Sequence, residues 1–116
     1  MTNQEAEKLL IDLSTMLDVK GIAGFKIARN MRMIQDELKE YVQFKEQLFR
    51  KYGEEKDGQL VVDKDNPNIA EFLHELEKLN QQEVNFDFRK ITEEELAESG
   101  LTAKQISLIW EMVDDC

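Results

Sequence analysis

The sequence predicts a mainly α fold of the α+β class: a long-helix hairpin or small bundle that carries a short two-stranded antiparallel sheet. Three observations support this prediction. Apolar residues recur at three- and four-residue spacing over most of the chain, only two short segments have the character of strands, and 116 residues is the length of one domain. We therefore expect a single domain over residues 1–116, without repeats and without a dividing linker.

The first element is predicted to be an amphipathic helix within residues 1–18. Thr2 and Glu5 fit a capping box, in which each side chain accepts a hydrogen bond from the backbone N–H of the other residue. The apolar face that follows consists of Leu9, Leu10, Leu13, Met16 and Leu17. Gly21 is expected to end this helix and, together with Gly24, to bracket a short flexible connection.

The strongest periodic signal predicts one long amphipathic helix over residues 22–52. Its apolar residues alternate between four- and three-residue steps and form a heptad seam: Ile27, Met31, Ile34, Leu38, Tyr41, Leu48 and Tyr52. Lys45 is the polar exception; it marks a solvated end or, as we favour, extends its ammonium out along the apolar surface. Such a seam needs a facing helix, from this chain or from a second copy in a homodimer, and we favour cover from within the chain.

Residues 59–91 are predicted to form a strand, a helix and a second strand. Glu54 to Gly58 are expected to be a charged turn, and residues 59–63 have the β-branched content of a strand. Asn66 and Pro67 fit a helix start, with an apolar face formed by Ile69, Phe72, Leu73, Leu76 and Leu79. Strict alternation over residues 84–91 predicts a strand that pairs with the first one and turns Val84, Phe86 and Phe88 inward.

Residues 92–114 are predicted to form two C-terminal helices. Thr92 with Glu95, and Thr102 with Gln105, fit two further capping boxes. The last helix is expected to carry the apolar residues Leu101, Ile106, Ile109, Trp110 and Val113.

The residue supply argues against an enzyme. His74 is the single histidine and Cys116 the single cysteine, so the groups for a Ser-His-Asp or Cys-His site, for a zinc site and for an intramolecular disulfide are missing. Asp63 and Asp65 open a segment like a calcium loop, but that loop needs Gly where Asn68 stands and Glu where His74 stands. We expect no catalytic residue, no metal, no cofactor and no glycine-rich phosphate loop.

The net charge of -10 is unevenly distributed, with a basic segment at residues 19–52 and a strongly acidic one at residues 53–116. The carboxylates that we consider as a partner-binding surface are Glu54, Glu55, Asp57, Asp63 and Asp65 around the first strand, and Glu93, Glu94, Glu95 and Glu98 near the tail. These side chains are either solvated beside the basic helix or a polyanion mimic for a basic protein surface.

Other partner classes are disfavoured. Lys26, Arg29 and Arg32 lie off the seam, but three bases on a chain of net charge -10 argue against direct nucleic-acid binding. No apolar run approaches the length of a membrane span, and the first twenty residues are too acidic for a signal peptide. We therefore expect a cytoplasmic protein with a protein partner.

Several short motifs resemble a family of small uncharacterised proteins encoded by phages and prophages of Gram-positive bacteria. They are Lys26–Asn30 at the entry of the long helix, Lys51-Tyr52-Gly53 at its end, the acidic turn with its strand, Glu83–Ile91 and the capped tail. The resemblance covers the chain after the first helix; it implies a viral origin and carries over no catalytic residue.

Two hypotheses follow from the charge pattern, the seam and the resemblance. In the first, the chain is a non-enzymatic acidic inhibitor that binds a host nucleic-acid-handling protein, such as a defence nuclease, in the host cytoplasm. In the second, it is a structural or assembly protein of the phage virion or tail that acts through its heptad seam, on a second copy or on a helical tail protein.

Overall fold

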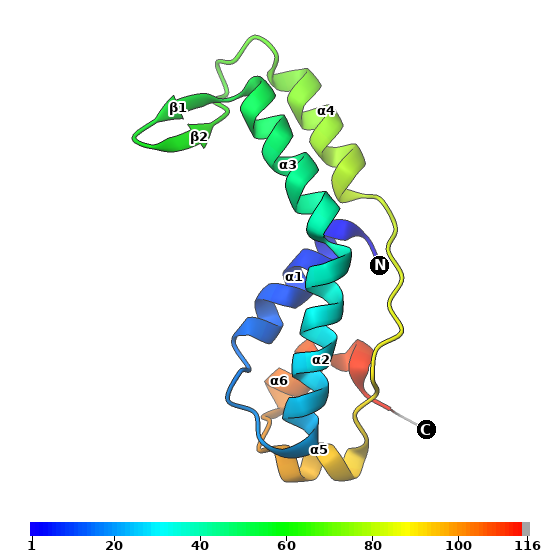
Figure 1. Cartoon of the computed structure of the whole chain (residues 1–116). Coiled ribbons are helices and arrows are strands. Elements are labelled where there is room, and N and C mark those ends of the chain that lie inside the picture. Colours follow the sequence, from blue (N-terminus) through cyan, green and yellow to red (C-terminus); the bar gives the residue numbers. More distant parts are fainter. Residues whose placement is uncertain (115–116) are drawn as a thin grey trace.

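The computed structural model describes residues 1–114 as an elongated molecule of 55 × 29 × 22 Å (Figure 1). The elements, in chain order, are α1 (Asn3–Ser14), α2 (Gly21–Glu37), α3 (Lys39–Tyr52), β1 (Glu54–Lys56), β2 (Gln59–Val61), α4 (Ile69–Asn80), α5 (Glu93–Ser99), α6 (Ala103–Leu108) and a 3-10 turn (Trp110–Met112). The predicted fold class, mainly α with a small two-stranded antiparallel sheet, is confirmed. The prediction for Cys116 concerns a residue outside the described range.

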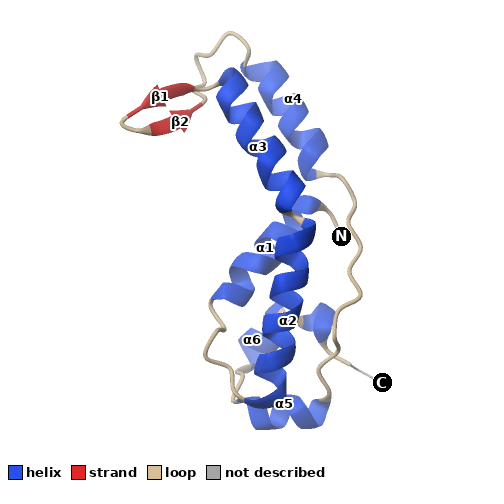
Figure 2. Cartoon of the chain, in the orientation of Figure 1, coloured by secondary structure: helices blue, strands red, loops and turns tan. Residues whose placement is uncertain are grey.

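The elements form two parts, best seen in Figure 2. We call α1, α2, α5, α6 and the 3-10 turn the body, and α3, α4 and the β-hairpin the arm. In the body α2 packs against α1 and α5, whereas in the arm α3 packs against α4. An extended segment, residues 82–91, runs from the end of α4 back along the body to α5.

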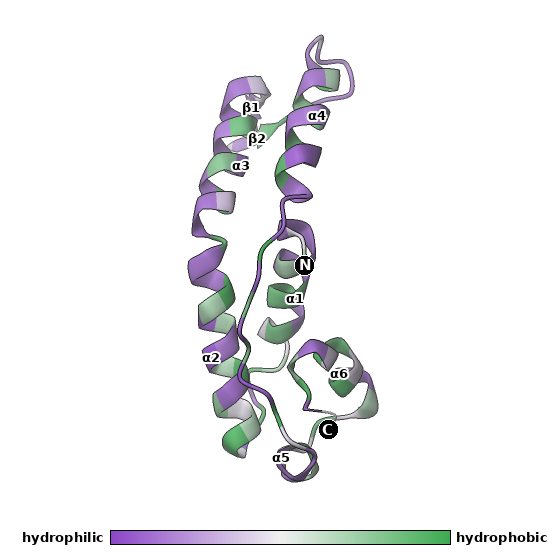
Figure 3. Cartoon of the chain, turned by 90° about the vertical axis from the view of Figure 1, so that its right-hand side faces the viewer, coloured by the Kyte–Doolittle hydropathy of each residue, from purple (hydrophilic) through white to green (hydrophobic). Residues whose placement is uncertain are grey.

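The core lies mainly in the body. The largest side chains there with almost no solvent contact are Leu13, Met16, Ile27, Ile34, Leu38, Ile91, Ile109 and Met112. The arm is thinner. Along α3 and α4, hydrophobic residues recur between hydrophilic ones, as is typical of amphipathic helices (Figure 3). Burial of apolar area therefore stabilises the body more than the arm.

The prediction of one helix over residues 22–52 is wrong at its centre, because the chain breaks helical geometry at Leu38. This residue has φ -83° and ψ 0°, while its N–H still donates to Ile34 and its carbonyl accepts from Val42. The i to i−4 hydrogen bonds therefore continue on both sides of Leu38, but the helix axis changes direction between α2 and α3. The bend allows α2 to pack on α1 and α5 while α3 packs on α4.

The predicted flexible connection between Gly21 and Gly24 is also wrong, since both residues belong to α2. The first helix ends earlier, at Ser14, and the chain turns through residues 15–20. A Cβ on Gly24 would lie 2.0 Å from the carbonyl oxygen of Val19. Glycine at position 24 therefore serves close approach of this turn to the helix, and not flexibility.

The predicted sheet is wrong in its pairing. The segment Glu54–Gly58, expected to be a turn, contributes β1, which pairs with β2 in the register Glu54 to Val61 and Lys56 to Gln59. Asp57 at φ 52° and Gly58 at φ 80° form the connecting turn. An Asp-Gly pair with two positive φ angles suits the twist of a tight hairpin.

Residues 84–91 do not form the predicted strand, although they are extended. Val84, Phe86 and Phe88 point inward as predicted and pack on the core cluster, with the rings of Phe86 and Phe88 stacked at 5.1 Å. The backbone of this segment pairs with a side chain: Asn30 Nδ2 donates to the Arg89 carbonyl at 3.1 Å, and the Arg89 N–H donates to Asn30 Oδ1 at 2.9 Å. This buried amide replaces the expected partner strand inside the segment. At its two ends, Val84 donates to the Met1 carbonyl and Ile91 donates to the Met112 carbonyl.

All three predicted capping boxes are confirmed, at Thr2, Thr92 and Thr102. The last helix is shorter than predicted, because α6 ends at Leu108 and Trp110 is exposed on the 3-10 turn. The start of α4 is also later than predicted.

Asn66 and Pro67 do not begin α4, which has Asn68 as its N-cap. Asn66 instead donates from Nδ2 to the Tyr52 carbonyl at 2.6 Å and accepts at Oδ1 from the Asn68 N–H. Leu73, expected on the apolar face of α4, is 54% exposed.

Candidate protein-interaction surfaces

The first acidic set lies on the β-hairpin, which projects from the end of α3 at the tip of the arm (Figure 1). Glu54, Glu55 and Asp57 are exposed and form no ion pair within residues 1–114. Asp63 differs, because it is partly buried and accepts a hydrogen bond from Lys56. This contact raises the pKa of the Lys56 ammonium, so one of the predicted carboxylates is neutralised within the arm.

Glu54, Asp63 and Asp65 meet beside a small pocket of about 120 Å³ behind the hairpin. Among the described residues, no group of three or more His, Cys, Asp or Glu side chains has the arrangement to hold a metal ion. Across residues 1–114, none of the helices combines the length and apolar character that a bilayer-spanning helix needs.

The second acidic set lies on α5, at the opposite end of the molecule from the hairpin (Figure 1). Glu93, Glu94 and Glu98 are exposed, whereas Glu95 is tied into the structure. The Lys26 Nζ donates to Glu95 Oε1 at 2.6 Å, and the backbone N–H of Thr92 donates to the same carboxylate. The Lys26 ammonium, with help from Thr92, holds the pKa of the Glu95 carboxyl below its usual range.

The structure therefore separates the two predicted acidic sets and does not bring them into one surface. Within residues 1–114, two ion pairs join the basic segment 19–52 to the acidic segment that follows it: Lys26 with Glu95, and Lys51 with Glu75 at 3.9 Å. Internal pairing accounts for Glu95 and Asp63 only, and the other carboxylates of both sets face solvent.

The heptad seam is covered from within the chain, as we favoured. Ile27, Ile34, Leu38, Tyr41 and Tyr52 are buried, and Met31 and Leu48 are half-buried. The covering elements are α1 and α5 along α2, and α4 along α3. A homodimer through the seam would have to displace these helices.

Lys45 is partly buried on the seam, with 30% of its side chain exposed. Its Nζ lies 3.1 Å from Glu7 Oε1 of α1 and 5.4 Å from the centre of the Tyr41 ring. Burial lowers the pKa of the Lys45 ammonium, but the Glu7 carboxylate and, to a smaller extent, Tyr41 raise it, and the net shift is upward. The one polar position of the seam therefore forms a partly buried ion pair between α3 and α1.

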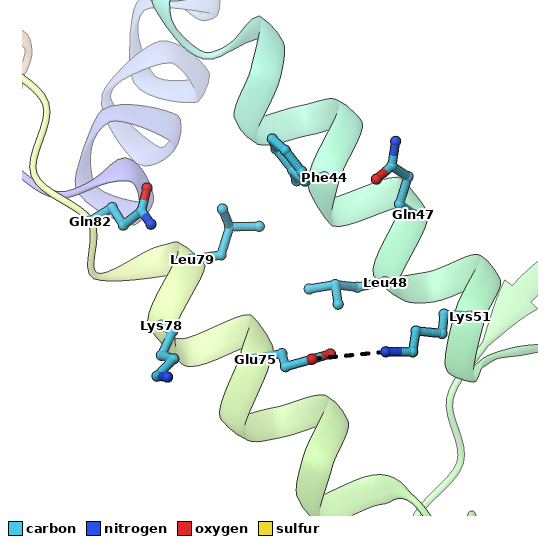
Figure 4. Close-up of a pocket in the computed structure, with 8 residues that line it drawn as sticks. All are labelled: Phe44, Gln47, Leu48, Lys51, Glu75, Lys78, Leu79 and Gln82. Atoms are coloured by element: carbon cyan, nitrogen blue, oxygen red, sulfur yellow. Dashed lines mark ion pairs between the residues drawn. The ribbon is translucent and has the colours of Figure 1, made fainter.

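The sequence interpretation missed a groove on the arm, shown in Figure 4. It has a volume of about 420 Å³ between α3 and α4. Its lining consists of Phe44, Gln47, Leu48 and Lys51 from α3, and Glu75, Lys78, Leu79 and Gln82 from α4 and the residues after it. One feature of the sequence does point to the groove. Phe44 lies off the heptad seam and widens the apolar face of the helix, and a widened apolar face indicates a second packing surface.

Comparisons of the chain with protein-family models, with curated proteins and with solved structures found no match. Function must therefore be argued from the surfaces described above.

Proposed function

We propose that this chain is a non-enzymatic, phage-type protein-interaction module whose acidic hairpin binds a basic surface on a host nucleic-acid-handling protein in the host cytoplasm. The observation that carries the proposal is that Glu54, Glu55 and Asp57 project at the tip of the arm, exposed and without an ion pair among the described residues. A cluster of carboxylates held away from the body can occupy a groove that otherwise binds the phosphates of a nucleic acid.

The α5 carboxylates are weaker candidates because the fold itself accounts for their position. Glu93 and Glu94 stand in the first turn of α5, where the helix dipole favours negative charge, and Glu95 completes a capping box. Asp57 belongs to the Asp-Gly turn, but Glu54 and Glu55 have no such explanation, because β1 is exposed over its whole length. Carboxylates that do not stabilise the fold are better evidence for a binding partner than carboxylates that cap or stabilise a helix.

The hairpin also carries charged side chains on both of its faces, and an apolar side chain on one of them. Glu55 pairs in register with Leu60, so a carboxylate and an exposed apolar side chain share one face. Glu54 and Lys56 lie on the other face, and Asp57 occupies the turn. A partner that fits this arrangement has basic side chains around a small apolar contact.

The test is affinity capture from the lysate of a Gram-positive host, with the full chain as bait, at low and at high salt. We expect a nucleic-acid-handling protein that is retained at low salt, released at high salt and displaced by duplex DNA. The triple variant Glu54→Gln, Glu55→Gln, Asp57→Asn should bind it about tenfold more weakly, because three contacts of about 0.5 kcal/mol each are lost.

The matched control is the triple variant Glu93→Gln, Glu94→Gln, Glu98→Gln, which removes the same amount of charge at the other end of the molecule. It should bind as tightly as the unmodified chain. Equal weakening by both triple variants would mean that only net charge matters, and salt-independent binding would exclude polyanion mimicry; either result contradicts the proposal.

A role in virion or tail assembly remains a prediction without a surface to support it. That hypothesis depended on a free heptad seam, and the seam is packed against helices of the same chain.

A further inference from the structure

The arm leaves one apolar face uncovered. In the groove between α3 and α4, Leu48 and Leu79 point toward each other, and Phe44 extends from α3 at its rim (Figure 4). Phe44 is 56% exposed. In a helical protein the stable arrangement places another helix over such a face.

The arm has no third element to do this. The body covers α2 with α1 and α5, whereas α3 packs along its length on α4 alone and contacts the hairpin, the end of α2 and, through Lys45 and Glu7, α1. Within the arm, buried side chains are few: Tyr41, Tyr52, Phe72 and Asn80. The hairpin projects away from the groove in Figure 1 and does not line it.

The charges of the groove limit the choice of occupant. Lys51 and Lys78 stand against Glu75, so the lining carries a net charge of +1 on a chain of net charge -10. Glu75 Oε2 is shielded from solvent and has no hydrogen-bond partner, which makes it the unsatisfied side-chain atom of the described residues. The other oxygen, Oε1, lies 3.9 Å from Lys51 Nζ of the same chain, whereas Lys78 forms no ion pair within residues 1–114. Lys78 can therefore pair with a carboxylate of the occupant.

We propose that the occupant is a second copy of this chain, docked with its α4 antiparallel to the first across a two-fold axis between Glu75 and Lys78. These residues are three apart and share one face of α4. Antiparallel pairing about their midpoint sets Lys78 of each protomer opposite Glu75 of the other, twice, as a two-fold interface requires. The two arms then form a four-helix arrangement around Phe44, Leu48 and Leu79.

Charge also favours the antiparallel orientation over a parallel one. The hairpin lies at the end of the arm where α4 begins, so an antiparallel pair keeps the two acidic hairpins at opposite ends of the interface. This dimer uses the open side of the arm and leaves the seam packed as described.

Sedimentation equilibrium of the full chain, from low to high micromolar concentration, tests the proposal. We expect a monomer–dimer equilibrium that Phe44→Glu weakens about tenfold or more, because a charge replaces an apolar contact at the centre of the interface. Phe25→Glu is the matched control: Phe25 is 59% exposed, but it lies on α2 in the body. Circular dichroism should show that both variants fold.

The charge pairing has its own test. Glu75→Lys alone and Lys78→Glu alone should each dissociate the dimer, since each sets like charges opposite one another. An equimolar mixture of the two variants should associate again, because both cross-protomer pairs are then of opposite sign. A wild-type chain that is monomeric throughout, a dimer that Phe25→Glu weakens as much as Phe44→Glu, or a mixture that stays monomeric would each overturn the proposal.

Discussion

Lys26 is the residue that most directly connects the basic and acidic halves of the chain. Its Nζ donates to Glu95 Oε1 at 2.6 Å and to the Lys90 carbonyl at 2.7 Å. Both groups of the pair are largely covered, with 22% of the Lys26 side chain and 17% of the Glu95 side chain exposed. One side chain of α2 thus positions the end of the extended segment and the first turn of α5.

This pair predicts a particular dependence of stability on pH. Because the pKa of Glu95 is depressed below its ordinary value of 4.5, the ion pair stabilises the fold above that pH and is lost as the pH falls through the lower folded-state value. Lys26→Met should therefore lower the melting temperature at pH 7, and the difference from the unmodified chain should shrink in acid. Thermal unfolding followed by circular dichroism across this range measures it.

The control for this prediction is Lys104→Met, at an exposed lysine on α6. It should leave the melting temperature nearly unchanged at every pH. A difference between Lys26→Met and the unmodified chain that stays constant down to pH 3 would mean that the hydrogen bond to Lys90, and not the ion pair, stabilises the contact.

At the scale of the element, the hairpin depends on its turn more than on its packing. Both strands have three residues and are exposed along most of their length, and two-stranded sheets are marginal without a hydrophobic face. The positive φ angles of Asp57 and Gly58 therefore matter, because they allow a connection of two residues.

We predict that Gly58→Ala destabilises the hairpin by about 1 kcal/mol, since a Cβ disfavours the left-handed backbone at φ 80°. No neighbouring atom lies within 4 Å of that Cβ, so the effect is one of backbone conformation and not of a clash. NMR chemical shifts should show loss of strand character at residues 54–61, while the shifts of the body stay unchanged. Gln59→Ala, at an exposed position of β2, should preserve the hairpin; equal loss in both variants would contradict the role of the turn.

At the scale of the whole molecule, the chain is more extended than its length requires. Its radius of gyration is 17.6 Å, whereas a compact domain of this length has about 13 Å. The bend at Leu38 and the separate packing partners of α2 and α3 produce this shape, because the arm does not fold back onto the body.

The unequal distribution of the core predicts unequal local stability. Hydrogen exchange should be slowest in α2, whose buried residues include Ile27 and Ile34, and clearly faster in α4, whose buried apolar residue is Phe72. Native-state exchange read by mass spectrometry would measure it at dilute concentration, where the arm is uncovered. Equal protection of the two helices would show that arm and body unfold as one unit.

The sequence by itself determined the features that depend on local chemistry. Each of the three capping boxes needs only a Thr and a Glu or Gln three residues later, and all three formed. The inward alternation of Val84, Phe86 and Phe88 and the burial of the seam followed from periodicity, which one-dimensional patterns report well. The carboxylates of the candidate surface could be named from the sequence as two sets, but their placement at opposite ends of the molecule could not.

Only the tertiary structure decided what each of these faces meets. The bend at Leu38, the glycine contact of Gly24 with Val19 and the pairing of Asn30 with Arg89 all join elements through space, and no local pattern encodes them. The groove on the arm is of the same kind, since it lies where α3 and α4 meet and exists only once these two helices pack side by side. Local hydrogen bonds and periodicity are properties of a segment, whereas pairing, exposure and open faces are properties of how the segments pack.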